Sequence, residues 1–336
     1  MRTLLFSLLF VLSTSSHADD TARNSPASHV DSATIAEQAT ILDTPTGKII
    51  GSLQLPTAQL PTAAGRVPLA IIVAGSGPTD RNGNSSMLPG PNNSLKQLAR
   101  ALADAGIASV RYDKRGIAAS AAAGPVESAL RFDNYVNDAS GWVQKMKQDE
   151  RFSSVAIIGH SEGSLIAMLA ARQAKADAYV SIAGPAQGAA DVLRKQLRPK
   201  LNGAAAAENE RVLLALEHGI LAGDVPAGFA ALYRPSIQPY LISWFRYVPA
   251  VELAKLDIPV LIVQGSTDLQ ITVADAEALK KAKPSATLAI VPGMNHVLKL
   301  VDGDLQEQIG SYSNAALPLA PELVKSVTQF LKANLK

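Results

Sequence analysis

The chain has 336 residues, of which 47% are hydrophobic, and its 31 basic and 29 acidic residues nearly balance. This length suffices for a core without covalent staples, and the lack of cysteine excludes disulfides. No basic stripe is present, so nucleic acid is not an expected partner. There is no HExxH, no phosphate loop and no complete dinucleotide fingerprint, so we expect no metal and no cofactor.

The N-terminus has the pattern of a cleavable secretory signal. Arg2 supplies the positive charge, residues 4–12 are apolar, and residues 16–18 (SHA) form a small-x-small cleavage site. We expect cleavage after Ala18 and a periplasmic or secreted product, with an uncleaved N-terminal anchor as the alternative. The apolar run is too short for a stable membrane span, and no second long run follows. Polar, aperiodic residues 19–34 predict a flexible linker.

Apolar runs of strand length then alternate with amphipathic helical patterns. This alternation indicates an α/β fold with a mostly parallel sheet and helices on both faces. Strands are expected at residues 35–42, 48–55, 67–74, 107–112, 154–158, 178–183, 259–264 and 287–291. Helices are expected at residues 92–106, 132–148, 162–175, 273–283 and 321–333.

The segment at about 185–250 interrupts this alternation. It has helix-like runs at 191–201 and 204–218 but no clear strand, and it is too long for a simple crossover. We therefore expect one domain over residues 35–336, with this segment inserted as a helical cap. An aromatic cluster in the cap is expected to line an apolar pocket. The cluster comprises Tyr233, Tyr240, Trp244, Phe245 and Tyr247.

A G-x-S-x-G pattern, Gly159-His160-Ser161-Glu162-Gly163, joins a predicted strand to a predicted helix. This is the setting of a nucleophile elbow, in which the two glycines permit close approach of strand and helix. The helix N-terminus also favours developing negative charge near Ser161. We interpret Ser161 as a nucleophile; the alternative is an ordinary turn serine.

A serine nucleophile needs a base, and the base needs an orienting carboxylate. His296, after the last predicted strand, is the expected base. The other histidines fall in the signal, the linker, the elbow and the cap: His17, His29, His160 and His218. We expect the His160 side chain to point away from Ser161. Asp268 follows a strand and fits the chain order Ser, Asp, His, although it could be a turn or N-cap residue.

Two backbone amides are expected to form an oxyanion hole. One is the N–H of Glu162, and the other is that of Ser76 or Gly77 in the glycine-rich loop after the third strand, unless this loop is a plain turn. The Glu162 side chain is expected to be only the variable residue of the elbow, with an acid catalyst as the alternative. Four nearby charged residues are expected to hold loops through ion pairs and turn hydrogen bonds: Asp80, Arg81, Asp113 and Arg115. The alternative is a direct substrate role for Arg81 or Arg115.

Five motifs in this order resemble bacterial serine carboxylesterases of the α/β-hydrolase superfamily. They are GSGPxDRxG (75–83), RYDKRG (111–116), GHSEG (159–163), GxxDxQ (265–270) and NHxLK (295–299). The resemblance extends from about residue 67 to the C-terminus, except for the cap. It implies a Ser161–Asp268–His296 triad and no cofactor.

Ala118 departs from the related sequences, which often have glycine there. This departure concerns the shape of the local loop and not the triad.

These features predict a hydrolase that cleaves small-molecule carboxylic esters through an acyl-enzyme. The same site would also suit a peptidase or amidase, a thioesterase, a lactonase or an acyltransferase. A peptidase would need acidic residues to hold the substrate amine, and the cap offers Glu208, Glu210, Glu217 and Asp224. A non-catalytic binding protein on a hydrolase scaffold is the alternative of another class.

Overall fold

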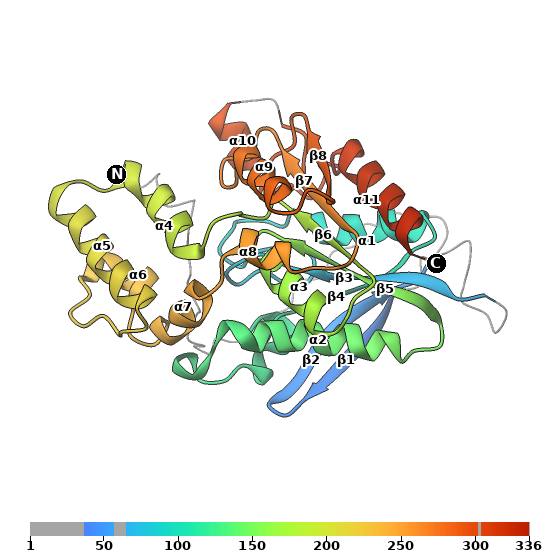
Figure 1. Ribbon diagram of the computed structural model, residues 1–336, viewed down its shortest axis with the longest axis horizontal. Coiled ribbons are helices and arrows are strands. Elements are labelled where there is room, and N and C mark those ends of the chain that lie inside the picture. The colour runs from blue at the N-terminus through green and yellow to red at the C-terminus, as the bar shows by residue number, and fades with distance from the viewer. Residues whose placement is uncertain (1–36, 57–64, 302–303, 336) are drawn as a thin grey trace, which may run out of the picture.

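The computed structural model describes residues 37–56, 65–301 and 304–335, so the predicted signal and linker lie outside the described residues. In the described chain, one eight-stranded sheet has the order β1-β2-β4-β3-β5-β6-β7-β8 (Figure 1). The strands are β1 (Glu37–Thr44), β2 (Gly47–Gln54), β3 (Val67–Val73), β4 (Ala108–Tyr112), β5 (Phe152–His160), β6 (Ala178–Ile182), β7 (Val260–Gly265) and β8 (Thr287–Val291).

Strand direction changes at one side of the sheet. The hairpin of β1 and β2 is antiparallel, and β2 also pairs antiparallel with β4. All the other pairings, from β4 through β3 to β8, are parallel. The mostly parallel sheet predicted from the sequence is therefore confirmed. Because the carboxyl ends of parallel strands share one edge, the loops after β3, β4, β5, β7 and β8 meet there.

The helices cover both faces of the sheet. They are α1 (Ser94–Asp104), α2 (Phe132–Lys147), α3 (Glu162–Gln173), α4 (Ala189–Leu197), α5 (Gly203–Glu217), α6 (Ala230–Tyr233), α7 (Gln238–Phe245), α8 (Pro249–Ala254), α9 (Val273–Ala282), α10 (Leu305–Ser311) and α11 (Pro321–Asn334). Short 3-10 helices are η1 (Ala118–Ala123), η2 (Glu127–Ala129), η3 (Arg198–Lys200) and η4 (Ala227–Phe229). The helix α10 and the short helices α6, α7 and α8 were not predicted. Within the described residues, no helix is long and apolar enough to cross a bilayer.

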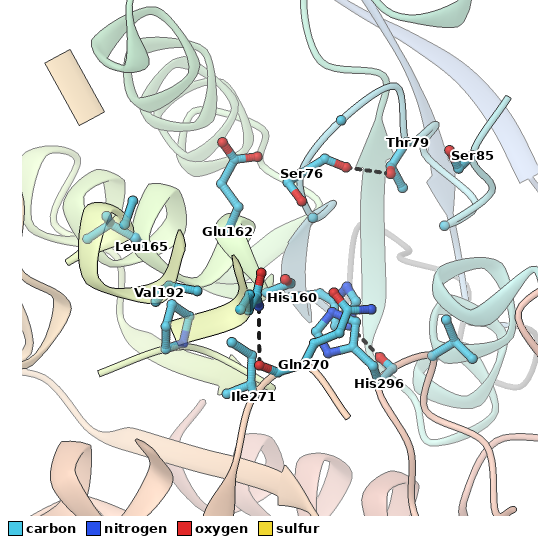
Figure 2. A pocket seen from close by; sticks show the side chains of 18 of the residues that line it. Ser76, Thr79, Ser85, His160, Glu162, Leu165, Val192, Gln270, Ile271 and His296 are labelled. Carbon is cyan, nitrogen blue, oxygen red and sulfur yellow. Dashed lines mark hydrogen bonds between the residues drawn. The ribbon is translucent and has the colours of Figure 1, made fainter. Parts of the chain in front are cut away.

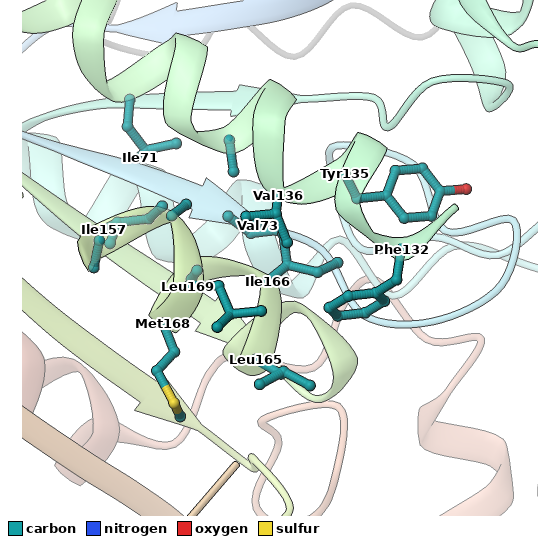
Figure 3. Packing of buried hydrophobic residues seen from close by; sticks show 14 of the residues in the cluster. Ile71, Val73, Phe132, Tyr135, Val136, Ile157, Leu165, Ile166, Met168 and Leu169 are labelled. Carbon is teal, nitrogen blue, oxygen red and sulfur yellow. The ribbon is translucent and has the colours of Figure 1, made fainter. Parts of the chain in front are cut away.

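The alternation of side chains along β3 explains why helices cover both faces of the sheet. Ile71 packs into a core with α2 and α3, whereas its neighbour Ile72 packs into a second core with α1 and α11. Side chains of a strand point alternately to the two faces, so a continuous apolar strand requires a helical layer on each side. Figure 3 shows the first core, in which Val73, Phe132 and Ile166 meet between the sheet and its helices.

The segment between β6 and β7 is helical and contains α4 to α8. We refer to residues 185–250, for which the sequence predicts a cap, as the cap segment. In Figure 1 the helices α4 to α7 extend to one side of the sheet. Contacts between α7 and α2 attach this segment to the body of the molecule.

Candidate active site

The chain turns sharply at Ser161, between β5 and α3. The serine has φ 56° and ψ −124°, a strained conformation for a residue with a side chain. The turn is also crowded. A Cβ on Gly159 would lie 2.2 Å from the carbonyl oxygen of Gly163, and a Cβ on Gly163 would lie 2.5 Å from that of Ala74. Only glycine fits at both positions, which explains the two glycines of the G-x-S-x-G pattern.

A buried pair, His296 and Asp268, follows β8 and β7. His296 Nδ1 lies 2.8 Å from Asp268 Oδ2, with side-chain exposures of 6% and 0%. Asp268 Oδ1 also accepts hydrogen bonds from the amides of Gln270 and Ile271, and Oδ2 accepts one from Gln264 Nε2. Burial would raise the pKa of Asp268, but His296 and these hydrogen bonds hold it below its usual value. Asp268 is therefore an ionised acceptor that fixes one ring nitrogen of His296.

The loops that carry these two residues are packed backbone to backbone. A Cβ on Gly265, at the end of β7, would lie 1.9 Å from the carbonyl oxygen of Met294. The same carbonyl accepts a hydrogen bond of 3.2 Å from the amide of Thr267. The glycine of the GxxDxQ motif thus permits the contact that brings Asp268 to His296.

His160 is placed differently from the expectation. Its Nε2 donates a hydrogen bond of 2.8 Å to the carbonyl oxygen of His296, and the two rings lie 4.9 Å apart. It lines the same cavity as Ser161, so the prediction that it points away from the site is wrong. Burial, together with the proximity of His296, lowers the pKa of His160 to about 3. His160 is therefore a neutral donor that holds the His296 backbone.

Ser161 and His296 face one cavity of about 300 Å³ at the carboxyl edge of the sheet (Figure 2). Glu162, Ser76 and Gly77, the residues expected to supply oxyanion donors, line the same cavity. Asp268 lies behind His296. The apolar residues of its lining include Leu165, Val192, Leu193, Trp244, Pro249 and Ile271. The polar residues of its lining include Thr79, Ser85, Asn92, Ser94, Gln270 and Tyr312.

Of the predicted aromatic cluster, only Trp244 lines this cavity. The hydroxyl of Tyr240 donates to Glu162, that of Tyr233 to Asn209, and that of Tyr247 to Asp133. Buried tyrosines need a partner for the hydroxyl group, and these partners turn the rings away from the cavity. The prediction of an aromatic pocket lining is thus wrong for the other four residues.

Glu162 has a second role that the sequence did not reveal. Its carboxylate is 2% exposed, forms an ion pair of 3.2 Å with Lys114 Nζ, and accepts a hydrogen bond from Tyr240. Lys114 Nζ also donates to the carbonyl oxygen of Gly75, at 2.6 Å. The Glu162 side chain therefore does more than occupy the variable position of the elbow. The only sequence signal for Lys114 was its place in the RYDKRG motif, directly after a buried strand.

The four charged loop residues have the structural role that was predicted. Asp113 accepts from the amide of Arg81 at 2.7 Å and forms an ion pair with its guanidinium at 3.1 Å. Asp80 accepts from two amides in its own turn, and Arg115 forms a buried ion pair with Asp138. None of these four residues lines the cavity. Within the described residues, no group of three possible ligands could hold a metal ion.

A family model and one known protein match parts of this chain by sequence. A family model described as serine aminopeptidase, S33, matches residues 92–210. Esterase EstD of Thermotoga maritima is 28% identical over 242 residues, and the match covers 71% of this chain but only 56% of that protein. The chain therefore spans little more than half the length of this relative.

Solved structures show the same architecture. Est1E of Butyrivibrio proteoclasticus, with ferulic acid bound, has a TM-score of 0.60 at 18% identity, covering 88% of this chain and 99% of that chain. The Pyrococcus furiosus esterase Pf2001 has a TM-score of 0.55 at 15% identity, covering 95% of this chain and 99% of that chain. At such identities the likeness concerns the fold. The chain therefore has the α/β-hydrolase fold, and in sequence it is similar to the serine aminopeptidase family model and to EstD.

Proposed function

We propose that this protein is a serine hydrolase that cleaves carboxylic esters with Ser161, His296 and Asp268. One observation carries the proposal. His296, which is hydrogen-bonded to the buried Asp268, faces the same cavity as a serine held in strained geometry at the end of β5. EstD is named an esterase, and Est1E has ferulic acid bound. The likeness to these two proteins supports the proposal.

The proposed reaction has two halves. Ser161 Oγ attacks the ester carbonyl carbon while His296 takes the hydroxyl proton, which gives a tetrahedral oxyanion. Collapse expels the alcohol, to which His296 returns the proton, and leaves an acyl-enzyme on Ser161. Water then attacks the acyl carbon with His296 as base and releases the acid. Asp268 keeps Nδ1 of His296 protonated, so that Nε2 is the nitrogen that exchanges the proton.

The charges around the cavity favour a neutral substrate. Among the described residues that line it, Glu162 is the one carboxylate, and Lys114 and Tyr240 already bind it. No lysine or arginine of the described chain lines it. We therefore propose an uncharged ester, with its apolar part against lining residues such as Leu165 and Trp244.

A second candidate is an aminopeptidase, because the matching family model is described by that activity. Such an enzyme would hold the substrate ammonium with a carboxylate. In the cap segment, Glu208 pairs with Arg211, and Glu210 and Glu217 pair with Arg194. Neither these residues nor Asp224 line the cavity. The charge pattern thus favours the esterase.

The test is hydrolysis of p-nitrophenyl esters from acetate to long acyl chains, beside amino acid p-nitroanilides. The Ser161→Ala variant is the control for the nucleophile. We expect ester turnover that this variant loses, and little anilide cleavage. Anilide turnover that exceeds ester turnover would favour the aminopeptidase. A wild-type protein that cleaves neither class and resists fluorophosphonate labelling would refute the serine hydrolase.

We also propose that residues 1–18 direct export and that cleavage after Ala18 yields a periplasmic or secreted enzyme. The charged, apolar and small-residue regions at the N-terminus support this. Expression with the N-terminus intact in a bacterial host, followed by mass spectrometry of the mature protein, tests it. A product that begins at Asp19 is expected, whereas a cytoplasmic product that retains Arg2 would contradict export.

A further inference from the structure

We propose that Lys114 is a positioning residue for the oxyanion hole and that the N–H of Ser76, rather than that of Gly77, is its second donor. This inference rests on the proposed function, since it concerns the same site. It arises from the sheet order. The strands β4, β3 and β5 are neighbours and parallel, so Lys114, Gly75 and Glu162 leave the sheet side by side at its carboxyl edge.

Lys114 is buried, and its ammonium group contacts three partners. Its side chain is 2% exposed, and Nζ lies 2.6 Å from the carbonyl oxygen of Gly75 and 3.2 Å from Glu162 Oε2. The ring of Tyr135 lies below it, with 5.0 Å between Nζ and the ring centroid. A buried ammonium is stable only when paired in this way, so the contacts are held tightly. Lys114 does not line the cavity and acts through the loop.

Peptide geometry links this contact to the oxyanion. The carbonyl of Gly75 and the N–H of Ser76 belong to one planar, trans peptide group, so they point in opposite directions. With the carbonyl held by Lys114, the N–H is directed away from it. A Cβ on Gly75 would lie 3.2 Å from Ser161 Cβ, so this peptide group borders the nucleophile. The carbonyl of the Ser76–Gly77 peptide is also held, by the hydroxyl of Thr79 at 2.7 Å in an exposed hydrogen bond. The Gly75–Ser76 peptide differs because a buried ammonium holds its carbonyl and because Gly75 borders Ser161.

Glu162 joins the two halves of the hole. Its backbone N–H is the other expected donor, and its carboxylate anchors the lysine that holds Gly75. The remaining carboxylate oxygen accepts from Tyr240 on α7, which connects the hole to the cap segment. Loss of Lys114 would therefore free the loop and leave a buried carboxylate with one neutral donor. The consequence is a disordered oxyanion donor beside an intact Ser161 and His296.

The kinetic test uses Lys114→Met, which keeps an apolar stem and removes the donors. Because one mispositioned oxyanion donor costs up to ~10²–10³ in rate, we expect kcat to fall ~10–10²-fold while KM changes less than about threefold. Glu162→Gln keeps one neutral acceptor oxygen in place of two charged ones and should lose less, about 3–10-fold in kcat. Arg115→Met is the matched control, since it breaks a neighbouring buried ion pair that does not touch the cavity. It should lower thermal stability but leave kcat within about twofold.

The structural test is a crystal structure of the wild-type enzyme labelled by a fluorophosphonate. We expect the phosphoryl oxygen to accept from the backbone N–H of Ser76 and of Glu162. An oxygen bound by Gly77 instead, or variants of Lys114 and Glu162 that keep the wild-type kcat, would overturn the inference. The direction of the Gly75 carbonyl in unlabelled wild-type and Lys114→Met crystals is readable without activity. An unchanged carbonyl in the variant would refute the role of Lys114, whereas absence of wild-type turnover would refute the proposed function.

Discussion

The replacement Asp268→Asn tests the proposed orienting role of Asp268 directly, because both carboxylate oxygens already accept hydrogen bonds. Oδ1 accepts from two backbone amides at 2.8 and 3.0 Å, and Oδ2 lies 2.8 Å from His296 Nδ1 and 3.2 Å from Gln264 Nε2. Asparagine offers one oxygen and one NH₂ group in the same space. One of the two donor pairs must therefore face an N–H group.

The less costly orientation places the asparagine oxygen toward the two backbone amides, which cannot move without breaking the turn. The NH₂ group then faces His296 and requires an unprotonated Nδ1. The proton moves to Nε2, which can no longer accept the proton of Ser161. An error of this kind costs on the order of 10³–10⁴-fold in kcat, or about 4 to 5.5 kcal/mol in the barrier. KM should change little, since Asp268 does not line the cavity.

The assay is steady-state hydrolysis of p-nitrophenyl acetate by the two proteins at matched folded concentration. Asp275→Asn is the control, because Asp275 is also buried and accepts from Thr272 and the Ala186 amide, without contacting His296. The control should stay within about threefold of wild type. A kcat for Asp268→Asn within tenfold of wild type would show that Asp268 does not orient the base.

Three further predictions follow from single residues. His160, with a pKa of about 3 against 6.5 unfolded, stays neutral where the unfolded chain is protonated, so stability falls as pH drops from 6.5 to 3. In urea titrations at several pH values, His160→Gln should reduce the slope of unfolding free energy against pH by up to about 1.4 kcal/mol per pH unit. An unchanged slope would contradict this role of His160. Ala118 is exposed and has φ 44°. Ala118→Gly should raise the free energy of unfolding by about 0.5 kcal/mol, because the strain relieved exceeds the entropy added to the unfolded chain. A lower free energy of unfolding in the variant would count against strain at this residue. Gly265→Ala, forced into the Met294 carbonyl, should lose at least ~10²-fold in kcat/KM with its circular dichroism retained; near-wild-type activity would refute this.

The sequence predicts the central elements well because burial there is two-sided. Continuous apolar runs such as β3 have no other stable environment than between two helical layers. The helix α10 escaped prediction because its seven residues are too few to show a period. The helix α7 escaped because apolar residues surround most of it, so that no single apolar stripe marks it as a helix.

Candidate site residues were predictable where a motif or chain order specifies them, as for Ser161 and His296. The pairing of Lys114 with Glu162 was not, because 48 residues separate them and only the strand order brings them together. The same reason applies to His160, whose partner lies 136 residues away on the last loop. The Ala118 departure from the related sequences did mark a real feature, since this residue has a positive φ.

The cap segment enters the chain between β6 and β7, and this position divides the proposed catalytic residues. Ser161 and the loop at Gly75 precede it, whereas Asp268 and His296 follow it. A cut at the exposed residues after η3, near Asn202, would therefore produce two fragments, neither with the full set. The two fragments would reassemble through the parallel pairing of β6 with β7. If coexpressed fragments regained the proposed esterase activity, the protein could serve as a split reporter with a coloured product. It would report the association of any two proteins fused to the new ends.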